Sequence, residues 1–482
     1  MTSGNVFLIG AGPGDPGLIT VKGRESLEKA DVVLYDRLVH PLLLQYAWEG
    51  AEYIYCGKLP QRHHLRQETI QDIMVEKARA GCTVVRLKGG DPGMFGRVGE
   101  EAEALAEAGI TYEMVPGITA GMAGPMYAGI PVTHRDLSGS FAAVTGHTKA
   151  EDGQPGVDWK SLAAGIDTTA FYMGRKNLAA IARRLIENGK DPATPAAVIE
   201  WAATSRQRVV EAPLERIQEE AEKHQIENPA ITIVGETAAL HRKLKWMEKK
   251  PLFGRFVWVV KTSPRESTMA ASLRSFGAEV LEAPGYTVDT RETKPPAPLR
   301  SFHHLHIAAE ESVDVLLDEL KQSRIDIRTL PGRITTESLR TLRKLESCGL
   351  FAEYTNESPS PEESLWIGPE HACRVAGLFS QKWVSHRLIH KKNTAEATAV
   401  LLQNDWINTI VIPSSQAVHI LWKELDRHGI SPVKWLTNKT VTAHGPETQK
   451  TLQDAGAAPD ITLSSPDTKT LLHELRTHSL QE

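Results

Sequence analysis

Short runs of β-branched and apolar residues alternate with helical patterns along the first half of the chain. The expected strands cover residues 6–9, 32–35, 83–87, 112–115, 169–173, 196–199 and 230–234. Residues 20–30 and 68–80 carry apolar side chains at helical spacing, and Gly81 and Gly109 stand where helices commonly end. This alternation is typical of an α/β fold with a largely parallel sheet.

The chain is too long for one hydrophobic core. Its 482 residues predict two to four domains. The segment 241–254 (HRKLKWMEKKPLFG) is basic and contains Pro251 and Gly254, which are common in linkers. We therefore predict one domain over residues 1–246, a linker over 247–254 and a second domain over 255–482.

Composition excludes several classes of protein. With 41% hydrophobic and 24% charged residues, the chain is expected to be globular. No apolar run approaches the ~20 residues of a membrane span, and no basic stretch predicts nucleic-acid binding at a net charge of −5. The cysteines lack Cys-x-x-Cys spacing, which argues against zinc and disulfides: Cys56, Cys82, Cys348 and Cys373. A cytoplasmic protein is expected.

The second half contains a weak internal repeat. A strand, a turn and an amphipathic helix over residues 306–320 parallel residues 411–425, and residues 336–342 parallel 446–452 in the same order. Chance similarity between amphipathic helices is the alternative, and the shared order of two pairs favours a repeat. Two similar α/β lobes are the expected architecture.

Glycine-rich turns follow three of the expected strands in the first half, at residues 10–17, 89–96 and 115–121. Because the carboxyl ends of parallel strands meet at one edge of a sheet, these turns predict a common binding cleft. The first turn could be a dinucleotide loop, but Pro13 and Pro16 lack the backbone donors that a phosphate cradle uses.

The motifs of the first half closely resemble one family. GAGPGDPGLIT, ADVVLYDRLV, VVRLKGGDPGMFGR, VPGITA, GIPVTHRD, VTGH and FYMG occur in the order and spacing of the uroporphyrinogen-III C-methyltransferases, in the tetrapyrrole methylase superfamily. The resemblance covers residues 4–246. It implies two α/β lobes with S-adenosylmethionine bound in a cleft between them, and S-adenosylhomocysteine as a product.

The resemblance also implies which residues surround the cofactor. They are Pro13, Gly89, Gly90, Asp91, Met94, Thr119, Ala120, Met173 and Ala202. Backbone groups and the Thr119 hydroxyl suit the polar ends of the cofactor, and methionine supplies polarisable apolar walls. Ala202 departs from the glycine common in relatives, although a backbone contact would tolerate that change.

Asp36 and Lys58 match the family's proposed proton acceptor and proton donor. Both follow expected strands, so both are expected to face the crevice. A salt bridge with Arg37 or a turn cap is the structural alternative for Asp36, and a solvated charge is the alternative for Lys58. The implied tetrapyrrole substrate carries carboxylates, for which the candidate partners are Arg62, His63, Arg66 and Arg135.

The second half resembles uroporphyrinogen-III synthase at two turns, over residues 410–418 and 443–452. Candidate substrate contacts there are Ser414, Ser415 and Thr448, whose alternative role is helix capping. The resemblance implies a two-lobed α/β synthase-like fold that cyclises hydroxymethylbilane to uroporphyrinogen III. Departures at residues 261–265 and 308–311 leave open a degenerate domain that only binds tetrapyrrole.

Three further expectations complete the prediction. His303, His304 and His306 are not expected to bind a metal, because a strand sends alternate residues to opposite faces. The methyltransferase family implies a homodimer through the first half. A bifunctional enzyme is the leading hypothesis, ahead of a monofunctional methyltransferase and a non-catalytic nucleotide sensor, and its product could serve sirohaem or cobalamin synthesis.

Overall fold

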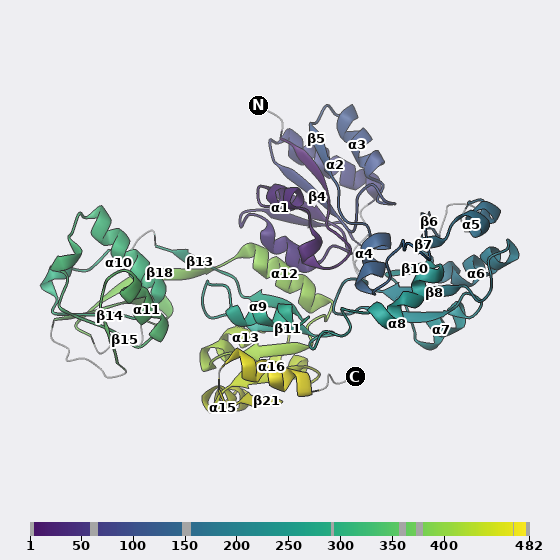
Figure 1. The fold of residues 1–482 in the computed structure, drawn as a ribbon. Coiled ribbons are helices and arrows are strands. Elements are labelled where there is room, and N and C mark those ends of the chain that lie inside the picture. Colours follow the sequence, from purple (N-terminus) through teal and green to yellow (C-terminus); the bar gives the residue numbers. More distant parts are fainter. Residues whose placement is uncertain are drawn as a thin grey trace. The chain divides into compact units, whose positions relative to one another are not determined.

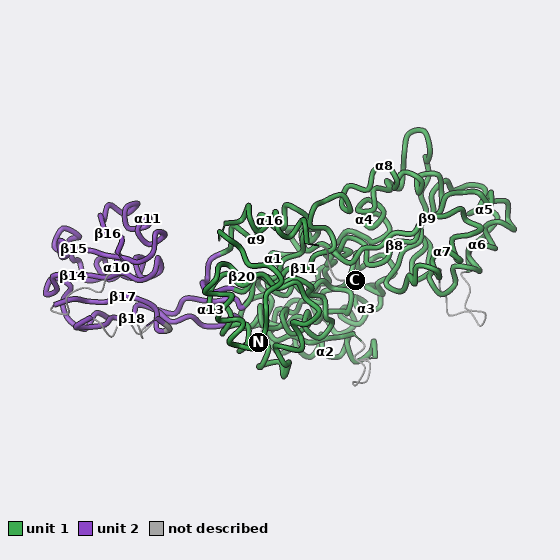
Figure 2. Tube along the Cα trace, turned by 90° about the horizontal axis from the view of Figure 1, so that it is seen from below, with its two compact units in different colours: residues 1–260, 266–283, 392–482 green, residues 261–265, 284–391 purple. Residues whose placement is uncertain are grey.

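The computed structural model describes residues 4–57, 66–146, 156–290, 294–355, 363–372, 379–465 and 467–478. These residues form four β-sheets flanked by helices (Figure 1), which confirms the predicted α/β class. Two compact units are coloured separately in Figure 2. Unit 1 (residues 1–260, 266–283 and 392–482) holds three sheets, and unit 2 (residues 261–265 and 284–391) holds the fourth.

The first sheet has the strand order β3-β2-β4-β1-β5 and is entirely parallel. Its strands are β1 (Val6–Gly10), β2 (Val32–Tyr35), β3 (Glu52–Tyr55), β4 (Val84–Lys88) and β5 (Tyr112–Val115). The four strands expected from the sequence all form, within one residue of the expected bounds. Helices α1 (Val21–Leu27), α2 (Gln67–Arg79) and α3 (Val98–Glu107) connect them. The Thr20 hydroxyl caps α1 by accepting a hydrogen bond from Gly23 N.

The second sheet has the order β6-β7-β10-β8-β9. Its strands are β6 (Phe141–Thr145), β7 (Thr168–Tyr172), β8 (Pro195–Glu200), β9 (Arg208–Pro213) and β10 (Ala230–Val234). Its helices are α4 (Ala120–Tyr127), α5 (Trp159–Gly165), α6 (Leu178–Glu187), α7 (Ile217–Lys223) and α8 (His241–Leu244).

The expectation of a largely parallel sheet is wrong for this second sheet. Only β6 and β7 pair in parallel, whereas β7–β10, β10–β8 and β8–β9 are antiparallel. The physical reason at β8–β9 is the short connection over residues 201–207, which leaves no room for a crossover helix. That connection carries Trp201 and Ala202.

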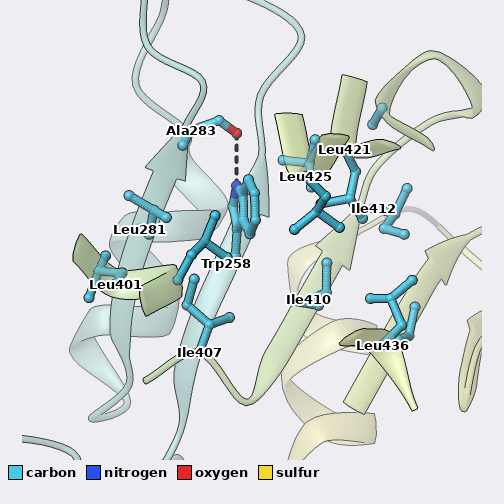
Figure 3. Close-up of a cluster of buried hydrophobic side chains, with 14 of the residues drawn as sticks. Trp258, Leu281, Ala283, Leu401, Ile407, Ile410, Ile412, Leu421, Leu425 and Leu436 are labelled. Carbon is cyan, nitrogen blue, oxygen red and sulfur yellow. Dashed lines mark hydrogen bonds between the residues drawn. The ribbon is translucent and has the colours of Figure 1, made fainter. Parts of the chain in front are cut away.

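The third sheet, also in unit 1, is parallel with the order β12-β11-β19-β20-β21. Its strands are β11 (Phe256–Val260), β12 (Glu279–Ala283), β19 (Thr409–Ile412), β20 (Thr440–His444) and β21 (Ile461–Leu463). Its helices are α9 (Thr268–Ser275), α12 (Lys392–Gln403), α13 (Ser415–Arg427), α14 (Pro432–Leu436), α15 (Pro446–Asp454) and α16 (Thr468–Thr477). Trp258 is fully buried at the centre of one core cluster (Figure 3), and its indole N–H donates to the Ala283 carbonyl at 2.9 Å. The ring therefore buries its apolar surface without leaving its one donor unpaired.

The fourth sheet forms unit 2, in the order β13-β18-β17-β14-β15-β16. Its strands are β13 (Tyr286–Asp289), β14 (His304–Ile307), β15 (Arg333–Thr336), β16 (Glu353–Tyr354), β17 (Ser364–Pro369) and β18 (Gln381–His390), with α10 (Glu310–Gln322) and α11 (Leu339–Ser347). The expected repeat has matching secondary structure. The series β14, α10, β15, α11 corresponds to β19, α13, β20, α15, and in each series the two strands are parallel neighbours.

Candidate functional site

Three glycine-rich turns meet at the carboxyl edge of the first sheet. Strand β1 lies between β4 and β5, so the turns after these strands are adjacent. A Cβ atom added to Gly117 would lie 2.3 Å from the Gly90 carbonyl oxygen and 2.7 Å from the Cα of Gly10. Only glycine permits this approach of three backbones, which explains the three turns that the sequence places there.

Hydrogen bonds hold these turns together. Gly12 and Gly90 exchange backbone hydrogen bonds of 3.1 and 2.7 Å. The Asp91 carboxylate accepts from the backbone N–H groups of Gly93 and Gly117, both at 2.8 Å. Asp91 therefore joins the second turn to the third and fixes the shape of the backbone that faces the cleft.

A cavity of about 590 Å³ opens beside these turns. The structure brings all nine predicted cofactor residues to its walls: Pro13, Gly89, Gly90, Asp91, Met94, Thr119, Ala120, Met173 and Ala202. The volume falls in the range of about 300 to 1,000 Å³ that is usual for small-molecule sites. Their role as cofactor contacts stays a prediction, but their convergence is a property of the fold.

Residues of the second sheet close the opposite side of the cavity. The Tyr172 hydroxyl lies 2.6 Å from the Thr119 hydroxyl and accepts from Gly121 N at 2.7 Å, which links β7 to the start of α4. Burial raises the pKa of Tyr172, so its hydroxyl stays protonated.

Three residues that line the cavity have a strained, left-handed backbone. Their φ values are 57° for Phe95, 55° for Met173 and 45° for Trp201.

Asp36 belongs to a buried charge network. Its carboxylate lies 2.6 Å from Arg86 Nη2, so its ion-pair partner is Arg86 and not the adjacent Arg37. Arg86 also reaches Glu101 at 3.2 Å, and the Lys88 ammonium lies 2.8 Å from the fully buried Glu101 carboxylate. Two carboxylates and two cations therefore balance one another, with Arg86, Lys88 and Glu101 buried and Asp36 half-buried.

The network shifts the ionisation of its two cations in opposite directions. Burial alone lowers the pKa of Arg86, yet the Asp36 and Glu101 carboxylates more than offset it and the pKa is raised. Burial and repulsion by Arg86 together lower the pKa of Lys88, despite its pairing with Glu101. Arg86 is thus a permanent positive charge that orients Asp36.

The predicted acid, base and substrate residues do not all meet at the cavity. Asp36 is half-buried beside it, and its neighbour Arg37 lines the wall. Arg66 and Arg135 are exposed and are not among the residues lining the cavity. Lys58, Arg62 and His63 lie outside the described residues.

Several cavity residues were missed by sequence reasoning. Arg37 and Lys176 are exposed cations on its wall, and no described carboxylate forms an ion pair with either. Arg37 follows Asp36 in a motif that the sequence did single out, so its position was a usable signal. Tyr172 stands in the FYMG motif and offered the same signal. Trp201 and Trp406 offered none, because aromatic residues near strand ends usually belong to a core.

The candidate contacts of the second half occupy helix starts in unit 1. Ser414 caps α13 by accepting from Ala417 N, and Ser415 is the first residue of that helix. The Thr448 hydroxyl donates to the His444 carbonyl at 3.0 Å, and Thr448 is only 2% exposed. The alternative capping role is therefore realised for Ser414, and any contact of these three residues with substrate stays a prediction.

The histidines and cysteines have ordinary structural surroundings. His304 and His306 each hydrogen-bond the Thr335 hydroxyl, at 2.7 and 2.9 Å, whereas His303 pairs with Glu363. Over the described residues, no group of three or more potential ligands is placed to hold a metal ion, and no helix is long and apolar enough to cross a membrane. Cys56, Cys82 and Cys348 are free thiols, and Cys373 falls outside the described residues.

Known proteins are similar to this chain over part or most of its length. The family described as Tetrapyrrole (Corrin/Porphyrin) Methylases matches residues 5–218. "Uroporphyrinogen-III C-methyltransferase" of Bacillus subtilis (strain 168) is 41% identical over 438 residues, 90% of each chain. "Porphyrin biosynthesis protein HemD" of Ruminiclostridium josui is 37% identical over 363 residues, 74% of this chain and 72% of the other. The structure of uroporphyrin-III C-methyl transferase from Thermus thermophilus with S-adenyl homocysteine is 41% identical, covers 49% of this chain and 100% of its own, and has a TM-score of 0.43. Because the similarity to the Bacillus protein extends over nine-tenths of both chains, this chain belongs to the tetrapyrrole methylases.

Proposed function

We propose that the first half transfers methyl groups from S-adenosylmethionine to C2 and C7 of uroporphyrinogen III, giving precorrin-2 and S-adenosylhomocysteine. The observation that carries this proposal is the convergence of nine predicted cofactor residues on one cavity. The name of the Bacillus relative, uroporphyrinogen-III C-methyltransferase, points to the same reaction.

The cavity fits such a methyl donor. The close approach of Gly10, Gly90 and Gly117 brings the three turns together. The cavity wall beside them includes Gly89, Gly90 and Thr119, whose polar groups suit the polar ends of the molecule. Met94 and Met173 add apolar, polarisable walls. A largely apolar cavity with a few polar groups is typical of sites that orient one small molecule.

The protein's own residues would align the reactants and move protons. When bound, the donor supplies a methyl group on a sulfonium, which a carbon nucleophile attacks directly. Asp36, oriented by Arg86, would accept the proton that the pyrrole loses after methylation, and Lys58 would donate one elsewhere. The exposed cations Arg37 and Lys176 would receive substrate carboxylates at the cavity wall.

We further propose that the second half cyclises hydroxymethylbilane to uroporphyrinogen III, which the first half then consumes. The matched β-α-β-α series of the two lobes supports this, because it agrees with the two-lobed fold implied by the synthase resemblance. The candidate contacts are Ser414, Ser415 and Thr448. A methyltransferase with a degenerate, tetrapyrrole-binding second half is the alternative.

One experiment separates these functions. The full chain is supplied with hydroxymethylbilane, with and without S-adenosylmethionine, and the products are resolved by chromatography. Uroporphyrinogen III without the cofactor and a dimethylated product with it support both activities. A parallel assay supplies preformed uroporphyrinogen III with the cofactor. Methylation of that substrate without any uroporphyrinogen III formed from hydroxymethylbilane refutes the synthase, and no methyl transfer to either tetrapyrrole refutes the methyltransferase.

We also propose a homodimer formed through the first half. Met122 and Met126 of α4 are 50% and 58% exposed, and the nearby Trp246 is 44% exposed while donating to the Met126 carbonyl. Grouped apolar side chains of this size are typical of interaction surfaces. Light scattering during size-exclusion chromatography tests the proposal, since a monomeric mass would contradict it.

A further inference from the structure

Within unit 1, helix α12 of the second half packs on the segment that follows Asp36. The buried Asn393 side chain donates to the Gln45 and Ala47 carbonyls at 2.9 and 2.8 Å. Next to it, the Tyr35 hydroxyl donates to Glu396 at 2.8 Å. Buried side-chain hydrogen bonds to backbone carbonyls fix position more firmly than surface ion pairs do. The second half thereby braces the strand end that carries Asp36.

A second set of contacts involves the β8–β9 connection. Glu279, at the start of β12, accepts from the backbone N–H of Ser205 at 2.8 Å and from its hydroxyl at 3.0 Å. The same carboxylate lies 3.4 Å from His40 Nε2. One residue of the second half therefore joins the two segments of the first half that lie on either side of the cavity.

Trp406 reaches the cavity itself. It is 9% exposed and is one of the lining residues. Its ring centre lies 5.4 Å from that of Trp201 and 5.5 Å from that of His40. The Arg206 guanidinium stacks on Trp201 at 4.1 Å and lies 5.3 Å from the Trp406 ring. A side chain from the second half thus forms part of a wall otherwise built by the first half.

We propose that Trp406 is a positioning residue for the methyl donor, so that the second half supplies one wall of the methyl-transfer site. This rests on the proposed methyltransferase function. Trp201 directly precedes Ala202, a predicted donor contact, and holds a left-handed φ of 45°. Edge-on packing of Trp406 supports this strained residue, and with it the placement of Ala202.

The test measures S-adenosylhomocysteine binding to the full chain by isothermal titration calorimetry. Trp406→Ala should raise Kd about fivefold or more, since it removes an aromatic contact and releases Trp201. Trp422→Ala is the matched control, because Trp422 packs against the same core cluster without lining the cavity, and it should leave Kd unchanged. If Trp406→Ala fails to fold, Trp406→Leu keeps apolar volume, removes the ring and should show the same weakening.

Steady-state kinetics then show which substrate the Trp406 substitution affects. We expect the KM for S-adenosylmethionine to rise in Trp406→Leu while the KM for uroporphyrinogen III and kcat change less than twofold. Wild-type Kd in a folded Trp406→Leu variant, or a change confined to the tetrapyrrole KM, overturns the inference. A wild-type chain that binds S-adenosylhomocysteine but methylates nothing refutes the proposed function and leaves the Trp406 measurement intact, whereas a wild-type chain that does not bind it refutes both.

Discussion

The Asp36 carboxylate lies 2.6 Å from the Arg86 guanidinium, and Arg86 in turn contacts Glu101 at 3.2 Å. Asp36, which matches the family's proposed proton acceptor, is therefore held by a buried cation, and Glu101 also balances the charge of that cation. The two carboxylates of this network differ in their exposure. Asp36 is half-buried beside the cavity, whereas Glu101 is fully buried.

Asp36→Asn should lower kcat for methyl transfer about 100-fold, because the amide keeps the shape but cannot accept a proton. The Kd for S-adenosylhomocysteine should stay within about twofold, as Asp36 does not line the cavity. Asp72→Asn, on the exposed face of α2, is the control. A variant with wild-type kcat would exclude Asp36 as the proton acceptor.

Glu101→Gln should destabilise unit 1 by about 3 to 5 kcal/mol, because it leaves Arg86 and Lys88 buried with one carboxylate between them. The neighbouring Glu100→Gln breaks an exposed pair with Arg97 and should cost at most about 1 kcal/mol. Chemical denaturation followed by circular dichroism compares the two. Equal midpoints would show that the network contributes no net stability.

Gly117→Ala should abolish S-adenosylhomocysteine binding in calorimetry, since the new methyl group would lie 2.3 Å from the Gly90 carbonyl and push two turns apart. Gly99→Ala in α3 meets no atom within 4 Å and should bind normally. Retained affinity in Gly117→Ala would mean that the turns separate without reshaping the site.

Acid should destabilise unit 2 through His306. Burial, with a smaller contribution from His304, lowers the pKa of His306 to about 4 from an ordinary value of 6.5. Between these values the unfolded chain binds the proton and the folded chain does not, so stability falls as pH falls from about 6.5 to 4, by about 2 kcal/mol at pH 5. His306→Gln, which cannot titrate, should lose correspondingly less stability between pH 7 and 5 in urea denaturation. A wild-type pH dependence in that variant would place the effect elsewhere.

The sequence alone determined the first sheet and the convergence of its turns. Strands such as Val6–Gly10 and Val32–Tyr35 are continuous apolar runs, because both faces of a parallel sheet are covered, and such runs can be recognised from the local sequence. Glycines at 10, 90 and 117 mark where backbones touch, and motif order assigned the nine residues that the fold gathers around one cavity.

The antiparallel pairs of the second sheet and the partner of Asp36 depend on how distant parts of the chain pack together. Strand direction depends on which strands become neighbours. Arg86 and Asp36 are 50 residues apart in the chain, and they meet because β4 lies beside β2. The same holds for Trp406, whose ring meets Trp201 across about 200 residues of sequence. Hydrophobic periodicity predicts which face of a helix or strand is buried. Which residues cover that face is determined only when elements distant in the sequence pack together.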